Sequence, residues 1–322
     1  MNHVNDVFIG VDLGGTNVRV GAITPLGDML TWQAAEIEAS RGPEAGVKKI
    51  SALVQRVAAS SDGSIKGIGI GAPGPLDRQH GTIQNPYTLP GWERVDIVSL
   101  IANQFGVPVA LENDADAAAL GEFWVGAGQG KSSLAMVTIG TGVGTALILN
   151  GQIFRGVGGA HQEGGHIIID PAGPECYCGA HGCWESLVSG TAIAQFARTA
   201  PELSSSILYQ TSQGDVDQLT ASMVFDAARE GDPLSLKLVD QTATYIALGL
   251  VNIIMLYLPD IIVLTGGVLR SYDLLEERIL AEIAHHDVVV PVHQVTIQLS
   301  QLGQQAGMFG AARAAQLLDK EN

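Results

Sequence analysis

Four side chains that bind soft metal ions lie close together in the middle of the 322-residue chain: His166, Cys176, Cys178 and Cys183. The three cysteines are the only ones in the sequence, so a disulfide would leave one thiol over. Three thiolates and one imidazole are a ligand set of closed tetrahedral zinc sites, which leave no position for a catalytic water. The spacing therefore predicts a structural zinc site. The alternative is three unpaired cysteines beside an incidental histidine.

Two carboxylates flank these ligands. Glu163 precedes His166 by three residues, and Glu185 follows Cys183 by two. A metal loop that fixes a glutamate at each end can direct both carboxylates at one small polar ligand. We therefore expect Glu163 and Glu185 to bind a ligand beside the metal.

A glycine turn near the start of the chain has the composition of an anion site. It reads Asp12-Leu13-Gly14-Gly15-Thr16-Asn17 and lies between two expected strands. Glycines at such a turn let backbone N–H groups approach an anion closely. Thr16 adds a hydroxyl, and Asp12 could hold a hydrated magnesium ion. By itself the motif fits an ordinary hairpin equally well.

A similar turn, Gly140-Thr141-Gly142-Val143-Gly144, follows about 126 residues later in a second strand meander. Two halves, each with a Gly/Thr hairpin, could grip a polyphosphate from both sides. A third turn, Gly266-Gly267, ends the expected strand DIIVLTGG. We expect it to open the helix YDLLEERILAEIAH. A helix start after a Gly-Gly turn can bind an anion or an adenosine group.

Asn113 and Asp114 end the expected strand PVALEND and precede an apolar helix. The carboxyl end of a strand is where an open α/β sheet binds its ligand. Local sequence alone favours Asp114 as a helix N-cap. Together with the phosphate-type turns and the metal loop, its position favours a general base.

The elements that must position these residues read as two α/β halves. Alternating apolar runs predict a strand meander over residues 7–37, followed by a helix over 43–60 and a strand ending at Gly74-Pro75. A last helix, roughly Gln304 to Leu318, is expected to pack back on the first half.

Composition narrows the class of protein. Hydrophobic residues make up 46%, charged residues 16%, and the net charge is −16, which disfavours nucleic acid as a partner. The apolar run Tyr245–Leu258 is too short to span a bilayer, and the N-terminus has no signal-peptide pattern. We expect a cytoplasmic protein with no membrane partner.

The pattern E-x-G-H followed by C-x-C-G-x-x-G-C-x-E resembles the signature of the ROK family, named for repressors, open reading frames and kinases. The resemblance runs from about Phe8 to Leu318 and departs from the usual pattern at Gln162 and Gly164. It implies an α/β, two-lobed actin/hexokinase/Hsp70-like fold with duplicated ribonuclease-H-like halves and an inserted zinc loop. The implied domains are 1–113, completed by the C-terminal helix 304–322, and 114–303 with the zinc loop.

The resemblance also implies an activity, the ATP-dependent phosphorylation of a hexose, with glucose favoured, Asp114 as base and Mg²⁺ bound with ATP. Sugar contacts are then expected at Gly74, Asn113, Asp114, Glu163, His166 and Glu185. ATP contacts are expected at Asp12, Gly14, Gly15, Thr16, Asn17, Thr141, Gly142, Gly144, Gly266 and Gly267. Thr88 stands where many relatives have Asn. By family analogy we expect a homodimer or homotetramer.

Other functions stay open. Kinases for N-acetylmannosamine, N-acetylglucosamine, fructose or allose share almost all of these residues. A sugar-sensing ROK regulator without turnover would need an N-terminal helix-turn-helix, for which Asp12 lies too near the start. A dinucleotide-binding oxidoreductase is disfavoured, because no G-x-G-x-x-G opens a helix.

Overall fold

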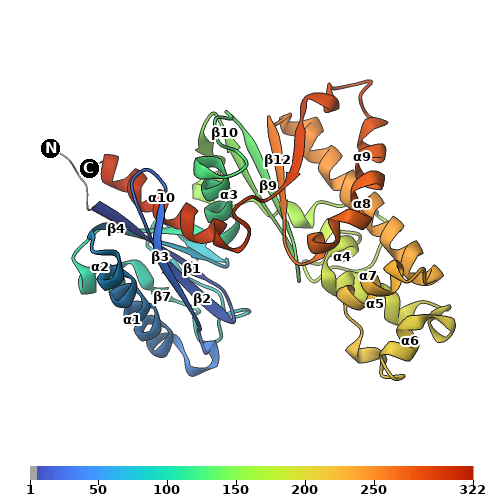
Figure 1. The fold of residues 1–322 in the computed structure, drawn as a ribbon, viewed down its shortest axis with the longest axis horizontal. Coiled ribbons are helices and arrows are strands. Elements are labelled where there is room, and N and C mark those ends of the chain that lie inside the picture. Colours follow the sequence, from blue (N-terminus) through green and yellow to red (C-terminus); the bar gives the residue numbers. More distant parts are fainter. Residues whose placement is uncertain (1–5, 322) are drawn as a thin grey trace. The chain divides into compact units, whose positions relative to one another are not determined.

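The computed structural model describes residues 6–321 and shows a mixed α/β protein (Figure 1). The chain divides into two compact units. Unit 1 comprises the described parts of Met1–Leu134, Ala146–His161 and Ser300–Asn322. Unit 2 comprises Ala135–Thr145 and Gln162–Leu299.

Unit 1 is built on a five-stranded sheet of order β3-β2-β1-β4-β8. The expected meander forms its antiparallel part, because β1 pairs with β2 and β2 with β3 in antiparallel register, whereas β4 and β8 continue the sheet in parallel. The five strands are β1 (Asp6–Leu13), β2 (Asn17–Ile23), β3 (Met29–Glu36), β4 (Ser64–Ala72) and β8 (Val109–Asn113).

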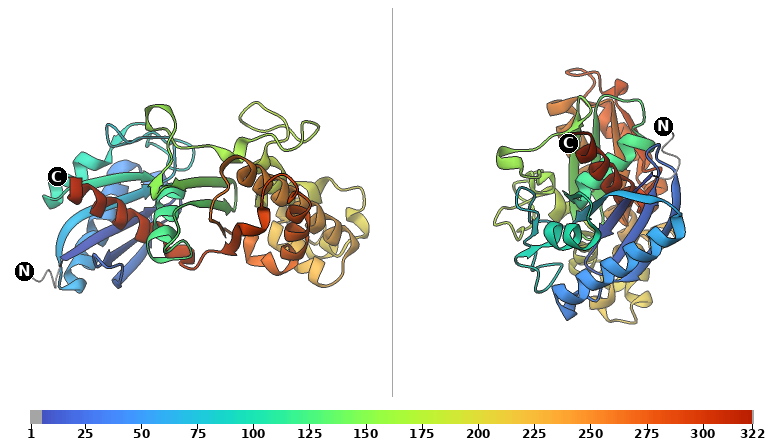
Figure 2. Two further views of the ribbon diagram at one scale, coloured as in Figure 1. Left: turned by 90° about the horizontal axis from the view of Figure 1, so that it is seen from above. Right: turned by 90° about the vertical axis from the view of Figure 1, so that its left-hand side faces the viewer.

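Successive side chains of β1 point to opposite faces of this sheet. Ile9 and Val11 belong to the buried cluster that includes α1 (Pro43–Ser61), whereas Phe8 packs with residues of α10 (Ala306–Glu321). On the α10 face, a β-carbon placed on Gly10 would clash with the Met308 carbonyl. The glycine therefore lets α10 lie along the sheet (Figures 1 and 2).

The carboxyl ends of β4 and β8 lead into the segments of unit 1 that carry Gly74, Asn113 and Asp114. β8 passes directly into α3 (Asp114–Val125), which packs against α10. A small antiparallel sheet follows β4, and α2 (Ile97–Phe105) comes after it. Its strands are β5 (Leu76–Asp77), β6 (Thr82–Ile83) and β7 (Val95–Asp96).

The second sheet has the order β11-β10-β9-β12-β13, so the expected second meander is also present. Its strands are β9 (Leu134–Ile139), β10 (Val143–Leu149), β11 (Gln152–Ile153), β12 (Ile261–Thr265) and β13 (Thr296–Leu299). The helices of unit 2 are α4 (Trp184–Val188), α5 (Gly190–Thr199), α6 (Ile207–Thr211), α7 (Ala221–Arg229), α8 (Pro233–Tyr257) and α9 (Glu276–Ala284).

One of these helices, α8, is long and apolar enough by length and composition to cross a membrane. Its most apolar stretch is 61% buried inside the protein, where it packs against α4, α7 and α9. That burial is typical of a core helix in a globular domain. The run Tyr245–Leu258 is helical up to Tyr257, and Ile246, Ala247, Leu250 and Ile254 within it are buried, whereas Leu256, Tyr257 and Leu258 at its end are exposed.

The structure corrects one expected element. No α-helix opens directly at Gly266-Gly267. A 3₁₀ segment, η6 (Val268–Leu274), comes first and is interrupted by the non-helical Ser271, and α9 begins only at Glu276. The apolar periodicity of the expected helix spans both pieces, and spacing alone does not reveal the break.

Candidate functional site

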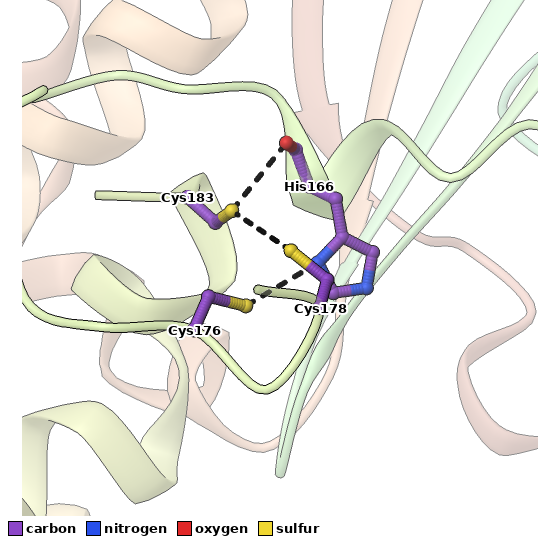
Figure 3. Close-up of side chains that lie close together, drawn as sticks. All are labelled: His166, Cys176, Cys178 and Cys183. Atoms are coloured by element: carbon purple, nitrogen blue, oxygen red, sulfur yellow. Dashed lines mark hydrogen bonds between the residues drawn. The ribbon is translucent and has the colours of Figure 1, made fainter. Parts of the chain in front are cut away.

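The four predicted metal ligands lie together at one point of unit 2 (Figure 3). Their ligand atoms all fall within 4.8 Å of one another. His166 Nδ1 is 3.5 Å from Cys176 Sγ, and Cys178 Sγ is 3.5 Å from Cys183 Sγ. Tetrahedral zinc, with Zn–S of about 2.3 Å and Zn–N of about 2.0–2.1 Å, sets its ligand atoms roughly 3.5–3.8 Å apart. The four residues therefore fit a zinc ion.

Short backbone turns bring these ligands together. Gly179 and Gly182 take φ values of 92° and 66°, which favour glycine, and the Cys176 amide donates to the Ala180 carbonyl at 2.8 Å. Burial raises the pKa of the Cys183 thiol to about 12. A thiolate at that position thus needs a cation beside it, and this requirement agrees with the zinc assignment.

The second nitrogen of His166 has a partner that the sequence did not reveal. Its Nε2 lies 3.0 Å from the hydroxyl of Tyr177, and the two rings meet edge to face. Tyr177 stands between two metal ligands in the sequence and is 83% exposed. If Nδ1 binds the metal, Nε2 carries the proton and donates to this hydroxyl.

The two flanking glutamates occupy different environments within unit 2. Glu163 is exposed and precedes the 3₁₀ turn η3 (Gly164–His166) that presents the histidine. Glu185 is half-buried in the first turn of α4, and its Oε2 accepts the Val143 amide at 2.8 Å. The amide of Gly164 donates to Thr145 Oγ1 at 3.1 Å. The metal loop is therefore tied to the start of β10.

The second glycine turn, residues 140–144, joins β9 to β10 and borders a cavity of about 580 Å³ in unit 2. Thr141 is exposed at the turn, and its carbonyl accepts the Thr191 hydroxyl at 3.0 Å. Helices α5 and α7, the segment η6 and the residues just before α7 and η6 supply the rest of the wall, including Thr191, Arg198, Ser222, Phe225, Gly267 and Arg270. Apart from Gly267, nothing in the spacing of these residues marked them as site residues.

The first glycine turn joins β1 to β2 in unit 1. The Gly14 amide donates to the Asn17 carbonyl at 2.9 Å, and Thr16 and Asn17 are exposed at the turn. Asp12 pairs with Arg19 Nη1 at 3.1 Å. Burial raises the pKa of Asp12, and the guanidinium of Arg19 opposes that shift. The sequence did not indicate Arg19 as its partner.

Asn113 at the carboxyl end of β8 and Asp114 directly after it have different structural roles. Asn113 is the N-cap of α3, because its Oδ1 accepts the amides of Ala115 at 2.8 Å and Asp116 at 3.4 Å. The N-cap interpretation of Asp114 is therefore wrong, since Asp114 is the first residue of the helix itself. Asn113 keeps its amide nitrogen toward Gly74, where a β-carbon would lie 3.5 Å from Nδ2.

Asp114 itself is exposed to solvent, yet the protein packed around it raises the pKa of its carboxyl by desolvation. The Ala115 amide, 2.9 Å from Oδ1, and the charge of His161 oppose that rise, whereas the charge of Asp116 adds to it. His161 Nδ1 lies 3.1 Å from the buried Asp116. The sequence did not reveal His161, because it lies outside the motifs.

The loop after β4 is held by a buried side chain, Asn85. Its Oδ1 accepts the amides of Tyr87 and Thr88 at 2.9 and 3.0 Å, and its Nδ2 donates to the Gly74 carbonyl at 2.6 Å. The same Nδ2 bonds the Thr88 hydroxyl. Asn85 thus fixes both Gly74 and Thr88, although only its neighbours had been singled out from the sequence.

The six predicted sugar-binding residues fall into two sets of three. Gly74, Asn113 and Asp114 belong to unit 1, and Glu163, His166 and Glu185 belong to unit 2. Of the predicted nucleotide residues, those of the first turn lie in unit 1, and those of the second and third turns lie in unit 2.

Two α/β units, each with a glycine hairpin, and a loop with a His/Cys₃ cluster define a protein of the hexokinase-like class. The profile of the ROK family matches residues 8–317. The chain belongs to the ROK family.

Relatives extend this finding over almost the whole chain. A glucokinase from Thermotoga maritima is 33% identical over 306 residues, 95% of this chain and 96% of the relative. The crystal structure of a ROK hexokinase from Thermus thermophilus shares 30% identity with a TM-score of 0.83, covering 98% of this chain and 100% of that one. A ROK family glucokinase from Streptomyces griseus, in complex with glucose and AMPPNP, shares 32% identity with a TM-score of 0.77, covering 97% and 99%.

Members of a second functional class match as well. A xylose repressor from Caldicellulosiruptor bescii is 26% identical over 94% of this chain, which spans 76% of the repressor. The match to the glucokinases is thus higher in identity and covers more of the relative's length.

Proposed function

We propose that this protein phosphorylates a hexose with ATP and that glucose is its preferred acceptor. The observation that carries the proposal is Asp114, the first residue of α3 directly after β8, whose carboxylate is open to solvent next to Asn113. In the proposed reaction Asp114 accepts the proton of the attacking sugar hydroxyl while the oxygen of that hydroxyl bonds to the γ-phosphorus of ATP. The bond from that phosphorus to the oxygen bridging to the β-phosphate breaks, and ADP leaves.

The acceptor sugar would be fixed through its other hydroxyls. Asn113 offers its amide donor, Glu163 and Glu185 offer carboxylate acceptors, and His166 Nε2 offers a donor. Gly74 admits the ring close to the backbone. A site that pairs each hydroxyl rejects epimers strongly, because a misplaced hydroxyl leaves a buried group unpaired.

The nucleotide would be held by the glycine turns of both units and by the cavity beside Thr141 and Gly267. Magnesium bound with ATP would neutralise phosphate charge, and Asp12 is the carboxylate proposed to hold it, through water. Its ion pair with Arg19 would then have to open or be shared. Zinc would keep the sugar-binding loop in shape and take no part in the phosphoryl transfer.

The test follows ADP release from Mg-ATP with the zinc-loaded protein over a panel of hexoses and N-acetylhexosamines. Glucose should give the highest kcat/KM. A higher value for N-acetylmannosamine, N-acetylglucosamine, fructose or allose would transfer the proposal to that sugar. Absence of turnover with every sugar, together with sugar binding seen by calorimetry, would favour the regulator class to which the xylose repressor belongs.

We also propose that the active protein is a cytoplasmic homodimer or homotetramer. The support is analogy with the family, and light scattering measures the assembly directly. The lobes implied by the family resemblance, 1–113 with 304–322 and 114–303, differ from the two compact units, because residues 114–134 and 146–161 belong to unit 1.

A further inference from the structure

In each of the first two glycine turns, one glycine lies against a residue outside the turn, Thr88 in the first turn and Glu185 in the second. In the second turn, a β-carbon placed on Gly142 would clash with Oε2 of Glu185. In the first turn, a β-carbon on Gly15 would lie 2.9 Å from the carbonyl oxygen of Thr88. These two glycines are therefore needed for contacts within the protein itself.

Gly140 and Gly267, on the proposed nucleotide side, have room for a β-carbon. A β-carbon on Gly140 would meet nothing nearer than the Gly267 amide nitrogen at 3.9 Å, and one on Gly267 would meet nothing within 4 Å. Both residues line the cavity that also contains Thr141. The second turn thus has two sides, because Gly140 borders the cavity whereas Gly142 touches Glu185.

The backbone of the same turn also holds the glutamate. The Val143 amide donates to Glu185 Oε2 at 2.8 Å, and a hydrogen bond to a charged acceptor is among the stronger kinds. This amide is therefore occupied by a carboxylate of the protein itself. Glu185 follows Cys183 by two residues, so the metal loop sets its backbone while the turn sets its carboxylate.

We propose that Gly142 and Val143 are positioning residues for Glu185: Gly142 leaves room for the carboxylate and the Val143 amide fixes Oε2, with Oε1 left for a sugar hydroxyl. This inference rests on the proposed function, in which Glu185 binds the acceptor sugar. It assigns part of a phosphate-type turn to the sugar site.

Two alanine variants of the same turn test the assignment. Gly142→Ala should raise the Kd and KM for glucose tenfold or more, as expected for displacing a charged hydrogen-bond acceptor, while the KM for ATP changes less than about threefold. Gly140→Ala, which places its methyl at the cavity, should instead raise the KM for ATP and leave the glucose Kd within about threefold. The same pattern in both variants, or an effect of Gly142→Ala on ATP alone, would overturn the proposal.

A double-mutant cycle tests the contact itself. Glu185→Asp withdraws the carboxylate by one methylene and makes room for a methyl at position 142. The effects of Gly142→Ala and Glu185→Asp on glucose Kd should therefore be strongly non-additive, whereas Gly140→Ala and Glu185→Asp should add. Additivity in both cycles would contradict the contact.

Amide hydrogen exchange keeps the proposal testable if Gly142→Ala does not fold. Glu185→Ala should speed exchange at the Val143 amide selectively, and unchanged protection there would refute the positioning role. This measurement needs neither sugar nor turnover. A wild-type protein that neither binds nor phosphorylates any sugar would contradict the proposed function separately.

Discussion

Asp114 can accept a proton only when its carboxyl is ionised, and desolvation by the protein packed around it raises the pKa of that carboxyl above its ordinary 3.8. Below the raised pKa the group is protonated and inactive as a base, and above it the group is ready. We therefore expect kcat/KM for glucose to fall as the pH decreases through this pKa. The pH profile should lose that acidic limb in Asp114→Asn.

Asp114→Asn should also reduce kcat by two to four orders of magnitude or more, because the amide cannot accept the proton. Its glucose Kd should stay within about threefold of wild type, since the amide still offers a hydrogen-bond acceptor. Asp28→Asn, on an exposed turn, is the matched control and should leave both values unchanged. A kcat for Asp114→Asn near that of wild type would end the assignment as base.

Removing the hydroxyl of Tyr177 should improve sugar binding. Its hydroxyl occupies His166 Nε2 at 3.0 Å, the atom proposed to donate to the sugar. A sugar hydroxyl must displace it, so Tyr177→Phe should lower the KM for glucose by a factor of about two to ten, in line with a single neutral hydrogen bond. Zinc content should stay at that of wild type. A raised KM with normal zinc would show instead that Tyr177 orients the histidine for binding.

At the scale of the element, the metal loop should depend on its ion for its shape. Backbone turns and four ligands hold it, and Cys176 and Cys183 are buried while Cys178 is exposed. Cys178→Ser should lower zinc content by elemental analysis and weaken glucose binding, because the loop carries both Glu163 and Glu185. His181→Ala, an exposed loop residue outside the cluster, should keep zinc and activity. Full glucose binding after verified removal of the metal would contradict this dependence.

Elements whose pattern is local could be predicted from the sequence, and partners that meet through the fold could not. Strand alternation and glycine turns located β1, β2, β9 and β10, and ligand spacing located the metal cluster. The pairing of Asp12 with Arg19 follows from the register of the β1–β2 hairpin, which strand alternation alone does not fix. The pairing of His161 with Asp116 joins distant segments and leaves no local signal. The same holds for the walls of the cavity in unit 2, where α5 and α7 show only ordinary amphipathic patterns.

The break before α9 and the cap of α3 were missed for a different physical reason. Apolar residues recur throughout the expected helix, whereas the backbone is 3₁₀ up to Leu274 and α-helical only from Glu276. At α3, Asn113 and Asp114 are both good capping residues, and one residue of register decides which side chain reaches the free amides. Composition cannot settle either choice.

At the scale of the whole molecule, the proposed sugar ligands divide evenly between the two units, three in each. A ligand that contacts both sets favours conformations in which the sets are close, by its differential contacts alone. Glucose should therefore reduce the radius of gyration in small-angle scattering. It should also slow hydrogen exchange where the chain passes between the units, near residues 134–135, 145–146, 161–162 and 299–300.

Two controls separate closure from a general effect of solutes. Sorbitol at the same concentration should cause neither change, because an acyclic polyol cannot present ring hydroxyls to both sets. Glu185→Ala removes one ligand of unit 2 and should weaken the response at equal occupancy of glucose. If saturating glucose leaves both scattering and exchange unchanged in wild type, the sugar site is already assembled before binding, and the binding free energy is not used to close it.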